Sequence, residues 1–466
     1  MSSHKIIYDL IHGYIQINPD IERVINSQSF QRLKNVKQLT AQHLYPSANH
    51  TRFEHSLGVM KLAMSFFEQL KPDLEKTHGG EIESLEKHLL FAALLHDVGH
   101  APLSHLGEQF FDKPGIIHEI GKELNKSETE TDYLTAGSPH EVMSCYIIVK
   151  NLKEELTAIY AFDYEFIFRI IVGAKYKQND VKNAMINIVN SNTIDVDKLD
   201  YLMRDSFMAG GIGPKIDLER LLMSLCIKDD ELYFTQKGLS SLQQIIDCRD
   251  NVYMWICNHH TAVYTDYLYG TFISYCNNNA VLKKEFGGTF SELLFSCDAI
   301  SKNYTSDNEA LYFIKKAIRI LNSEQDDGFA RNIITQLETR HYLKPTWKTL
   351  YEYSRFMKSV FPEKEDREQA IAYIVENSES LIAKIRDKLH IEPAKLFFVS
   401  RQNKFYYGHM DKISINVKGE KESLSNLLPP RNYAELYEEV AFYLFCEEAN
   451  VAAVKAELKR LLYGME

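Results

Sequence analysis

The stretch Leu89 to His105, LLFAALLHDVGHAPLSH, limits what this chain can fold into more than any other. Its first half, Leu89 to Leu95, is apolar on every side, which is typical of a helix buried all round. The end of such a helix carries His96 and Asp97 into the interior, where an unpartnered charge costs several kcal/mol. A bound metal cation would remove that cost. For an isolated His-Asp pair, two satisfied core polar residues are an equally good explanation.

Composition indicates a globular protein with a large core. Of the 466 residues, 45% are hydrophobic, which predicts one main domain with a smaller appended one. No apolar run approaches the ~20 residues of a membrane span, and the N-terminus lacks the features of a signal peptide. The seven cysteines form no CxxC pair, which argues against a zinc ribbon and predicts reduced thiols in a cytoplasmic protein. A net charge of −11 disfavours broad binding of nucleic acid.

The N-terminal residues predict a β-hairpin followed by a helix. Apolar residues alternate on either side of His12-Gly13, which is typical of a hairpin that lies against a helical body. Residues 19–40 are predicted to form one helix. The basic residues near its end, Arg32, Lys34 and Lys37, are more simply explained as a solvated charged face than as part of a site.

A second helix is predicted over residues 49–70, where apolar residues recur with helical period. Arg52 and His55 are three residues apart, so they share a face near the start of this helix. By itself His55 is an ordinary core or capping histidine. Beside the His96-Asp97 pair it becomes a candidate third ligand.

After His105 the helical pattern continues, and Glu108 lies above His105 on the same face. Residues 113–135 are polar, and we expect a mobile excursion beside the site. Ser138-Pro139-His140-Glu141 has the sequence of a helix start, with a capping serine and a proline at the first position. His140 would then lie in the first turn, where an anion is favoured, although a surface histidine there needs no function.

The second strong signal is TIDVDKLDYLMRDSFMAGGIG, residues 193–213. On a helix, Asp197, Tyr201 and Asp205 form one polar stripe about 12 Å long. Lys198 and Arg204 bring positive charge beside it. The simpler alternative is an exposed helix with charge pairs four residues apart.

The remaining chain predicts a hairpin that turns at Asp229-Asp230 and then helices up to about residue 390, broken at Asp326-Asp327 and at Lys344-Pro345. Short strands are expected from Ala394, and a final helix over 433–462.

Five stretches in order, YDLIHG, FQRLKNVKQL, TRFEHSLGVM, LLHDVGHAPLSH and IDVDKLDYLMRD, give the chain a family resemblance. With the pattern His55, His96-Asp97 and Asp197, they resemble the HD phosphohydrolase superfamily and its deoxynucleoside triphosphate triphosphohydrolase branch. The likeness is to the HD domain of the branch members that also carry a SAM domain, and we expect no SAM domain here. It is dense over residues 5–270 and thin beyond.

The resemblance implies a mainly α fold: an HD-domain helical core with an N-terminal β-hairpin and a small C-terminal α+β lobe. Together with the pattern of the later chain, it predicts the HD core at 1–280, a helical extension at 281–390 and the lobe at 391–466. It also implies a divalent cation as cofactor, Mn²⁺, Fe²⁺, Mg²⁺ or Zn²⁺. The implied metal ligands are His55, His96, Asp97 and Asp197.

The resemblance assigns the other candidate residues to phosphate, proton and sugar. Arg52, His100 and Lys198 would hold the phosphates. His140, oriented by Glu108, would manage the proton of the attacking water, and His105 would protonate the leaving sugar oxygen. The residues implied to contact the deoxyribose or base are Gln38, Leu39, Tyr201, Asp205 and Tyr264.

Two positions depart from the family pattern. Glu108 stands where Asp is frequent, and the place of an arginine that grips the distal phosphates falls near Ile256. The second departure leaves open whether a triphosphate is the preferred substrate.

We therefore expect a metal-dependent phosphohydrolase that converts dNTPs to deoxynucleoside and tripolyphosphate. The alternatives are a phosphatase or phosphodiesterase for another phosphate ester, and a catalytically idle nucleotide-binding scaffold. The expected partner is a nucleotide substrate, with no membrane and no stable nucleic acid, and the expected assembly is a homo-oligomer, a dimer or tetramer.

Overall fold

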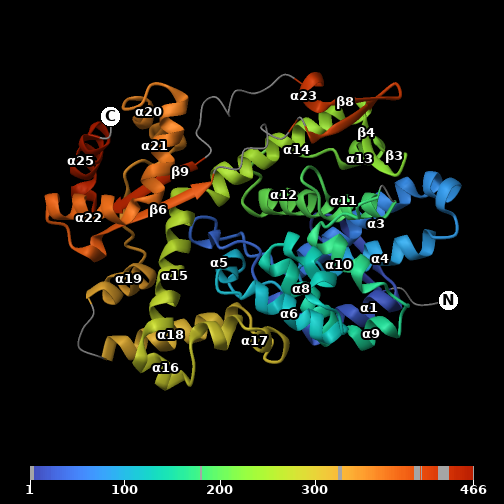
Figure 1. Cartoon of the computed structure of the whole chain (residues 1–466), viewed down its shortest axis with the longest axis horizontal. Helices are drawn as coiled ribbons and strands as arrows, with labels where there is room; N and C mark the ends of the chain where they lie inside the picture. Colours follow the sequence, from blue (N-terminus) through green and yellow to red (C-terminus); the bar gives the residue numbers. More distant parts are fainter. Residues whose placement is uncertain are drawn as a thin grey trace. The chain divides into compact units, whose positions relative to one another are not determined.

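The computed structural model describes residues 5–178, 181–323, 328–402, 410, 412–428 and 440–464. Helices dominate and the sheets are small (Figure 1), which confirms the prediction of a mainly α fold. The chain divides into two compact units: unit 1 is Met1–Arg249, Gly288–Phe313 and His409–Pro429, and unit 2 is Asp250–Gly287, Ile314–Gly408 and Pro430–Glu466. The boundaries of these units differ from the divisions at 280 and 390 that the sequence predicts. The units describe compactness, so the predicted domain divisions stay a prediction. Within the described residues, no helix combines the length and the apolar character needed to cross a membrane.

The predicted N-terminal hairpin is present in unit 1. Strands β1 (Lys5–Asp9) and β2 (Gly13–Ile17) are antiparallel, with Tyr8 opposite Tyr14. Asp9 closes the turn, because its carboxylate accepts from the backbone N–H groups of Ile11 and His12, each at 2.9 Å. Gly13 has a positive φ of 68°, a conformation that glycine adopts without strain.

The single helix predicted over residues 19–40 is wrong, because the chain starts a new helix within it. Helix α1 (Pro19–Ile25) is followed by α2 (Gln28–Gln31) and the 3₁₀ turn η1 (Arg32–Asn35). The Ser27 hydroxyl accepts from the N–H of Phe30, and this N-cap fixes the second start.

Arg32 is buried, so its assignment to a solvated face is also wrong. Its guanidinium donates to the carbonyls of Val98 (3.1 Å), His100 (2.6 Å) and Thr305 (2.6 Å). Burial lowers the pKa of Arg32 to about 10. The bonds to Val98 and His100 fix the turn that follows the His96-Asp97 pair, and the bond to Thr305 connects Arg32 to a distant segment of the chain. Lys34 is exposed, as predicted, with its ammonium 4.7 Å from the ring centroid of Phe53.

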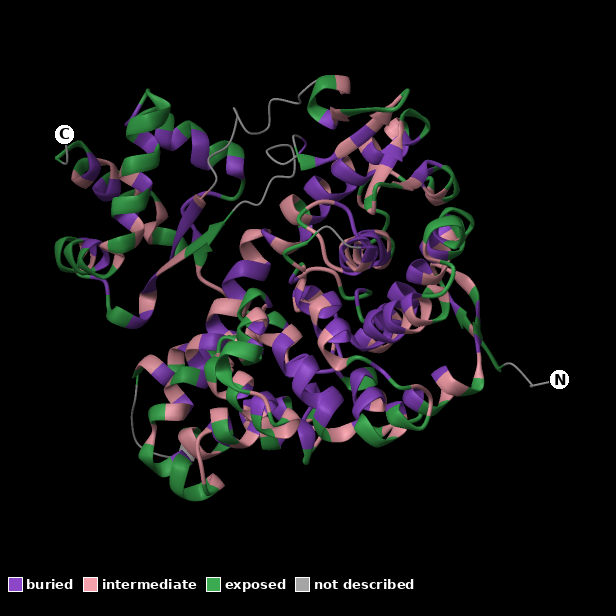
Figure 2. Cartoon of the chain, turned by 45° about the vertical axis from the view of Figure 1, so that its right-hand side comes forward, coloured by how far each residue is buried: buried purple, intermediate pink, exposed green. Residues whose placement is uncertain are grey.

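Two long helices form the centre of unit 1. Helix α3 (Arg52–His78) starts with a capping box between Thr51 and Glu54. Helix α4 (Ile82–Leu95) ends with its residues from Phe91 onward all buried, as the apolar run predicts. Helices α10 (Tyr164–Val172), α11 (Val181–Val189) and α12 (Val196–Met208) pack around this pair. Figure 2 shows several helices that are buried over much of their length.

Residues 113–135 are folded, which corrects the expected mobile excursion. They form α6 (Lys113–Leu124), α7 (Glu128–Thr131) and the start of the 3₁₀ turn η3 (Asp132–Ala136). Ile116 and Ile120 are buried, and α6 packs on α8 (Pro139–Asn151). Helix α8 begins as predicted, with a capping box between Ser138 and Glu141. A few buried isoleucines are therefore enough to fix a segment whose overall composition is polar.

A four-stranded sheet completes unit 1, in the order β3-β4-β7-β8. Its strands are β3 (Leu225–Lys228), β4 (Glu231–Thr235), β7 (Ser414–Val417) and β8 (Glu420–Ser423). The predicted turn at Asp229-Asp230 joins β3 to β4, and both aspartates have positive φ. Helices that lie in unit 1 or begin there are α5 (His105–Glu108), α9 (Lys153–Thr157), α13 (Leu218–Leu222), α14 (Leu239–Val252), α17 (Cys297–Ser301), α18 (Asp307–Ser323) and α23 (Leu424–Leu427).

Unit 2 is built on a three-stranded antiparallel sheet of order β5-β9-β6. Its strands are β5 (Lys344–Pro345), β6 (Leu396–Gln402) and β9 (Val440–Cys446). Its helices are α15 (His260–Asn278), α16 (Ala280–Phe286), α19 (Gly328–Thr339), α20 (Leu350–Lys358), α21 (Lys364–Glu376), α22 (Ser378–Leu389) and α25 (Val451–Tyr463).

The predicted final helix over 433–462 begins too early. Residues 440–446 are the central strand of the unit 2 sheet, and the helix starts only at Val451. The apolar run VAFYLFC suits a strand with neighbours on both edges and both faces covered. Residues 433–439 of this prediction, 403–408 of the predicted strand before it, and the break at Asp326-Asp327 lie outside the described residues.

A glycine at position 99 is required by the approach of α8. A Cβ atom on Gly99 would lie 2.2 Å from the backbone nitrogen of Ser144 and 2.3 Å from the carbonyl carbon of Met143. We expect Gly99→Ala to lower the free energy of unfolding by about 1–3 kcal/mol, the usual cost of overpacking. The midpoint of urea unfolding measures this. Gly80→Ala is the matched control, because nothing lies within 4 Å of a Cβ there. Equal midpoints for the two variants would contradict the packing argument.

Candidate functional site

Four side chains predicted as metal ligands converge in unit 1. His55 comes from α3, His96 and Asp97 follow α4, and Asp197 lies in the first turn of α12. The Nε2 atom of His55 is 3.3 Å from Nε2 of His96 and 3.0 Å from Oδ1 of Asp197. The two oxygens of Asp97 lie 3.6 Å from Nε2 of His55 and 3.7 Å from Nε2 of His96. Ligands bound at about 2.0–2.2 Å to one ion lie roughly 3 Å apart, so His55, His96 and Asp197 fit a metal centre, and Asp97 lies slightly farther out.

The hydrogen bonds behind the two imidazoles also favour a cation between them. His55 donates through Nδ1 to Oδ2 of Asp200 at 2.8 Å, and His96 donates through Nδ1 to the carbonyl of Ala93 at 2.8 Å. Each Nε2 is therefore left with a lone pair that points toward the other and toward two carboxylates. Burial disfavours the charged imidazole, but the hydrogen bonds to Asp197 and Asp200 raise the pKa of His55 to about 10. The centre thus attracts a proton strongly, and a divalent ion would take the place of that proton.

Asp200 is a buried residue of the site that the sequence analysis missed. Its carboxylate accepts from Nε2 of His12 (2.6 Å), Nδ1 of His55 (2.8 Å) and Nε of Arg204 (2.8 Å). Arg204 also donates to Oδ2 of Asp9 at 2.8 Å. The hairpin is thereby connected to a metal-ligand candidate. Asp200 and Arg204 are four residues apart on a helix, and this spacing was the available signal, although it more often marks an exposed pair.

Arg52 lies directly beside the candidate metal centre. Its guanidinium donates to Oδ2 of Asp97 at 2.7 Å, to the hydroxyl of Ser104 and to the carbonyl of Gln38. Burial alone would raise the pKa of Asp97, but Arg52 and His96 hold it well below its ordinary value. Asp97 is consequently an anion in the interior, with the guanidinium of Arg52 as its partner.

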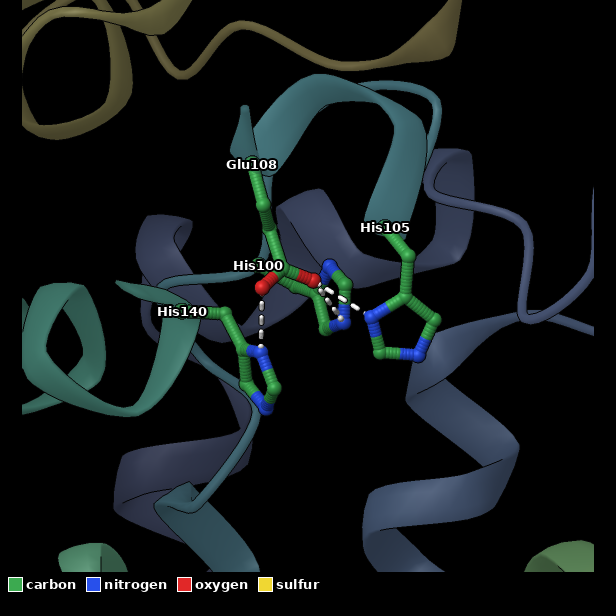
Figure 3. Close-up of side chains that lie close together, drawn as sticks. All are labelled: His100, His105, Glu108 and His140. Atoms are coloured by element: carbon green, nitrogen blue, oxygen red, sulfur yellow. Dashed lines mark hydrogen bonds and ion pairs between the residues drawn. The ribbon is translucent and has the colours of Figure 1, made fainter. Parts of the chain in front are cut away.

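Figure 3 shows the second cluster, which consists of His100, His105, Glu108 and His140. The carboxylate of Glu108 accepts from Nδ1 of His105 at 2.5 Å and from Nδ1 of His140 at 2.9 Å. The rings of His100 and His140 are stacked with centroids 4.4 Å apart. His105 is open to solvent, with 70% of its side chain exposed, whereas His100 is fully buried. The carboxylate of Glu108 therefore connects the exposed imidazole of His105 to the half-buried one of His140, while Nε2 of the buried His100 lies 3.6 Å from it.

The burial of this cluster affects the pKa values of its members in different ways. Burial would raise the pKa of Glu108, but His140 and His105 hold it well below its usual range. Burial opposes a charge on His140, yet Glu108 raises its pKa to about 9. Burial and the nearby Arg52 lower the pKa of His100 far below the ordinary value, so its ring is neutral. Nε2 of His140 lies 3.8 Å from Oδ1 of Asp97, so the two clusters are adjacent.

The other residues predicted to contact substrate differ in their burial and in their hydrogen-bond partners. Lys198 donates to the carbonyl of Ser191 at 2.8 Å and to Oδ2 of Asp195 at 2.5 Å. Asp205 is buried and accepts from Nε2 of His50 at 2.7 Å. Leu39 and Tyr201 are half-buried. Gln38 is buried, and its Oε1 has no hydrogen-bond partner among the described residues. Their contacts with substrate stay predictions.

Tyr264 belongs to unit 2 and is occupied by contacts there. Its ring is stacked on Phe445 with centroids 4.1 Å apart, and its hydroxyl donates to Oε1 of Gln336 at 2.9 Å. This packing explains its burial. Its predicted contact with a sugar or base is not needed to account for its position and stays a prediction.

The architecture and the His-Asp centre define the class of the first unit. Residues 52–202 match the family model of the HD domain, so this chain contains an HD domain. This range includes all four candidate metal ligands and the second cluster.

The relatives of that domain include named nucleotide hydrolases. The chain is 32% identical over 265 residues to the deoxynucleoside triphosphate triphosphohydrolase SAMHD1 homolog of Dictyostelium discoideum. The aligned region covers 55% of this chain and 46% of that protein. It is 34% identical over 237 residues to deoxynucleoside triphosphate triphosphohydrolase SAMHD1 of Gallus gallus, covering 47% and 36%. It is also 30% identical over 273 residues to the uncharacterized protein MJ1154 of Methanocaldococcus jannaschii, covering 56% and 48%. The chain thus spans about half the length of these relatives or less.

A solved structure supports the fold over the whole chain. A hypothetical protein from Aquifex aeolicus is similar with a TM-score of 0.64 over 98% of this chain and 100% of that one. At 21% sequence identity this likeness concerns the fold alone.

We expect Asp197→Ala to strip the ion from the centre and leave the fold intact. The change removes one anionic ligand, and the buried imidazoles can then stay neutral. The affinity for the ion should fall by more than the roughly 10–100-fold that loss of an outer-shell partner costs. Metal analysis after dialysis measures the loss, and circular dichroism checks the fold. Asp73→Ala removes an exposed carboxylate of α3 and is the control. Full metal occupancy in Asp197→Ala would refute the ligand assignment.

Proposed function

We propose that this chain is a metal-dependent phosphohydrolase that hydrolyses dNTPs to deoxynucleoside and tripolyphosphate. The observation that carries the proposal is the adjacency of a cation-binding centre and an acid–base cluster, joined at Asp97 and His140 across 3.8 Å. The names of two relatives, which describe dNTP triphosphohydrolases, support the choice of substrate. A cytoplasmic location, which rests on the unpaired cysteines, and a homodimer or homotetramer, which rests on the family resemblance, are part of the proposal.

The cation held by His55, His96, Asp97 and Asp197 would neutralise phosphate charge and make a water molecule more acidic. In the reaction a bond forms between the water oxygen and the α-phosphorus, and the bond from phosphorus to the 5′ oxygen breaks. His140 takes the proton of the water, with its ring fixed by Glu108. Glu108 raises the pKa of His140 to about 9, and the charge of a cation bound beside it would lower that pKa and so make the neutral ring available.

The leaving 5′ oxygen needs a proton, and His105 is the residue proposed to give it. Its Nδ1 is bonded to Glu108, so Nε2 is left to face the substrate. Arg52 is proposed to bind a phosphate oxygen, and its hydrogen bond to Asp97, which lies beside the metal centre, supports this. His100 and Lys198 are proposed to assist this binding.

Product masses test the reaction directly. Purified protein is incubated with Mn²⁺ and a panel of nucleotides and other phosphate esters, and the products are identified from their masses by mass spectrometry. We expect deoxynucleoside and tripolyphosphate. Release of orthophosphate alone, or turnover of a different ester only, would replace the proposal with a phosphatase or phosphodiesterase. No turnover with any metal would favour an idle nucleotide-binding scaffold.

We expect His105→Asn to bind metal and substrate but to turn over about 10²–10⁴-fold more slowly, the usual range for losing an acid–base group. The measurement is kcat at saturating substrate, together with metal content. His118→Asn changes an exposed histidine of α6 and is the control. A wild-type rate in His105→Asn would move the proton donor elsewhere, with His140 as the first alternative.

A further inference from the structure

The two ring nitrogens of His100 are buried and lack hydrogen-bond partners among the described residues. Its side chain is fully buried. A buried polar group without a partner costs about 1–3 kcal/mol, so such groups point to a missing ligand. Its Nε2 is 3.6 Å from Oε1 of Glu108, which is beyond hydrogen-bond distance but within reach of a shared ion.

The donor atoms around His100 suit a transition metal. One atom each from His100, His105, Glu108 and His140 lies within 4.8 Å of the other three. Nδ1 of His105 is 2.5 Å and Nε2 of His100 is 3.6 Å from Oε1 of Glu108. Ligands at about 2.0–2.2 Å from a tetrahedral ion lie roughly 3.3 Å apart, and the stacked rings of His100 and His140 would turn to direct their nitrogens at one ion. Imidazoles with one carboxylate favour Zn²⁺ and Co²⁺ over Mg²⁺.

Charge and access are also favourable. Glu108 supplies a negative charge that is only 10% exposed, which strengthens its attraction for a cation. His105 is 70% exposed, so an ion can reach the cluster from solvent without a change in the fold.

We propose that His100, His105, Glu108 and His140 form a second metal site, distinct from the His55–His96–Asp97–Asp197 centre and selective for Zn²⁺ and similar ions. This site is inhibitory. An ion bound to Nδ1 of His105 and to Glu108 separates the proton donor from the carboxylate that orients it. The inhibitory role rests on the proposed function, whereas the binding of the ion does not.

Metal counting tests the binding without any substrate. Metal-free protein is loaded with Co²⁺, dialysed and analysed for metal, while the visible absorption of Co²⁺ is followed. We expect two ions per wild-type chain, one in Asp197→Ala, one in His105→Ala and two in His118→Ala. The exposed position of His105 makes its removal harmless to the fold, which circular dichroism checks. One ion in the wild type, or two in His105→Ala, would overturn the second site.

Zinc titration tests the inhibition. At a fixed concentration of Mn²⁺ and dNTP, added Zn²⁺ should lower the wild-type rate by about 10²-fold, as loss of the acid would. The already slow His105→Asn variant should show no further loss of that size. An unchanged wild-type rate with the second ion bound would overturn the inhibitory role. Two bound ions without hydrolysis of any dNTP would refute the proposed function and leave the second site standing.

Discussion

The buried carboxylate of Asp200 is the interaction on which the HD centre depends. It is fully inaccessible, and burial would raise its pKa, but Arg204, His12 and His55 hold that pKa well below the ordinary value. Removing one partner of a buried ion pair costs about 3–5 kcal/mol, because the remaining charge stays desolvated. The orientation of His55 is therefore set by the hairpin and by α12 together. A Cβ on Gly58 would lie 1.9 Å from Oδ1 of Asp200, so α3 must carry a glycine there.

The parts of the fold that the sequence predicts are those with strong local signals. The apolar run before His96 and the periodic apolar residues after Arg52 identify α4 and α3, because burial of one face dictates the spacing. Ser138 and Glu141 mark the start of α8 through the hydrogen bonds of its first turn. The four candidate metal ligands are brought together by the structure; the sequence itself suggests His55 and the His96-Asp97 pair, whereas Asp197 enters as a ligand through the family resemblance. Nothing in the spacing of three distant segments specifies that they meet.

The missed features depend on contacts between distant residues. Arg32 looks like a surface residue until its carbonyl partners are known, and one of them, Thr305, is 273 residues away. The run from 440 to 446 is apolar throughout, and such a run does not distinguish a strand from a buried helix. The isoleucines of α6 are few among polar residues, so composition underestimates their packing on α8.

The turn before His105 has a strained backbone, and contacts with other parts of the fold hold it in place. Leu103 and Ser104 both have positive φ, 62° and 54°, although neither is glycine. Such residues cost about 1–3 kcal/mol each and persist only where the surroundings impose them. Here Asp307 accepts from the N–H of Leu103 at 2.7 Å, and Arg52 donates to the hydroxyl of Ser104. Selection for thermostability alone would favour glycine at these two positions. Glycine would relieve the strain, but the imidazole of His105 would then be held less firmly.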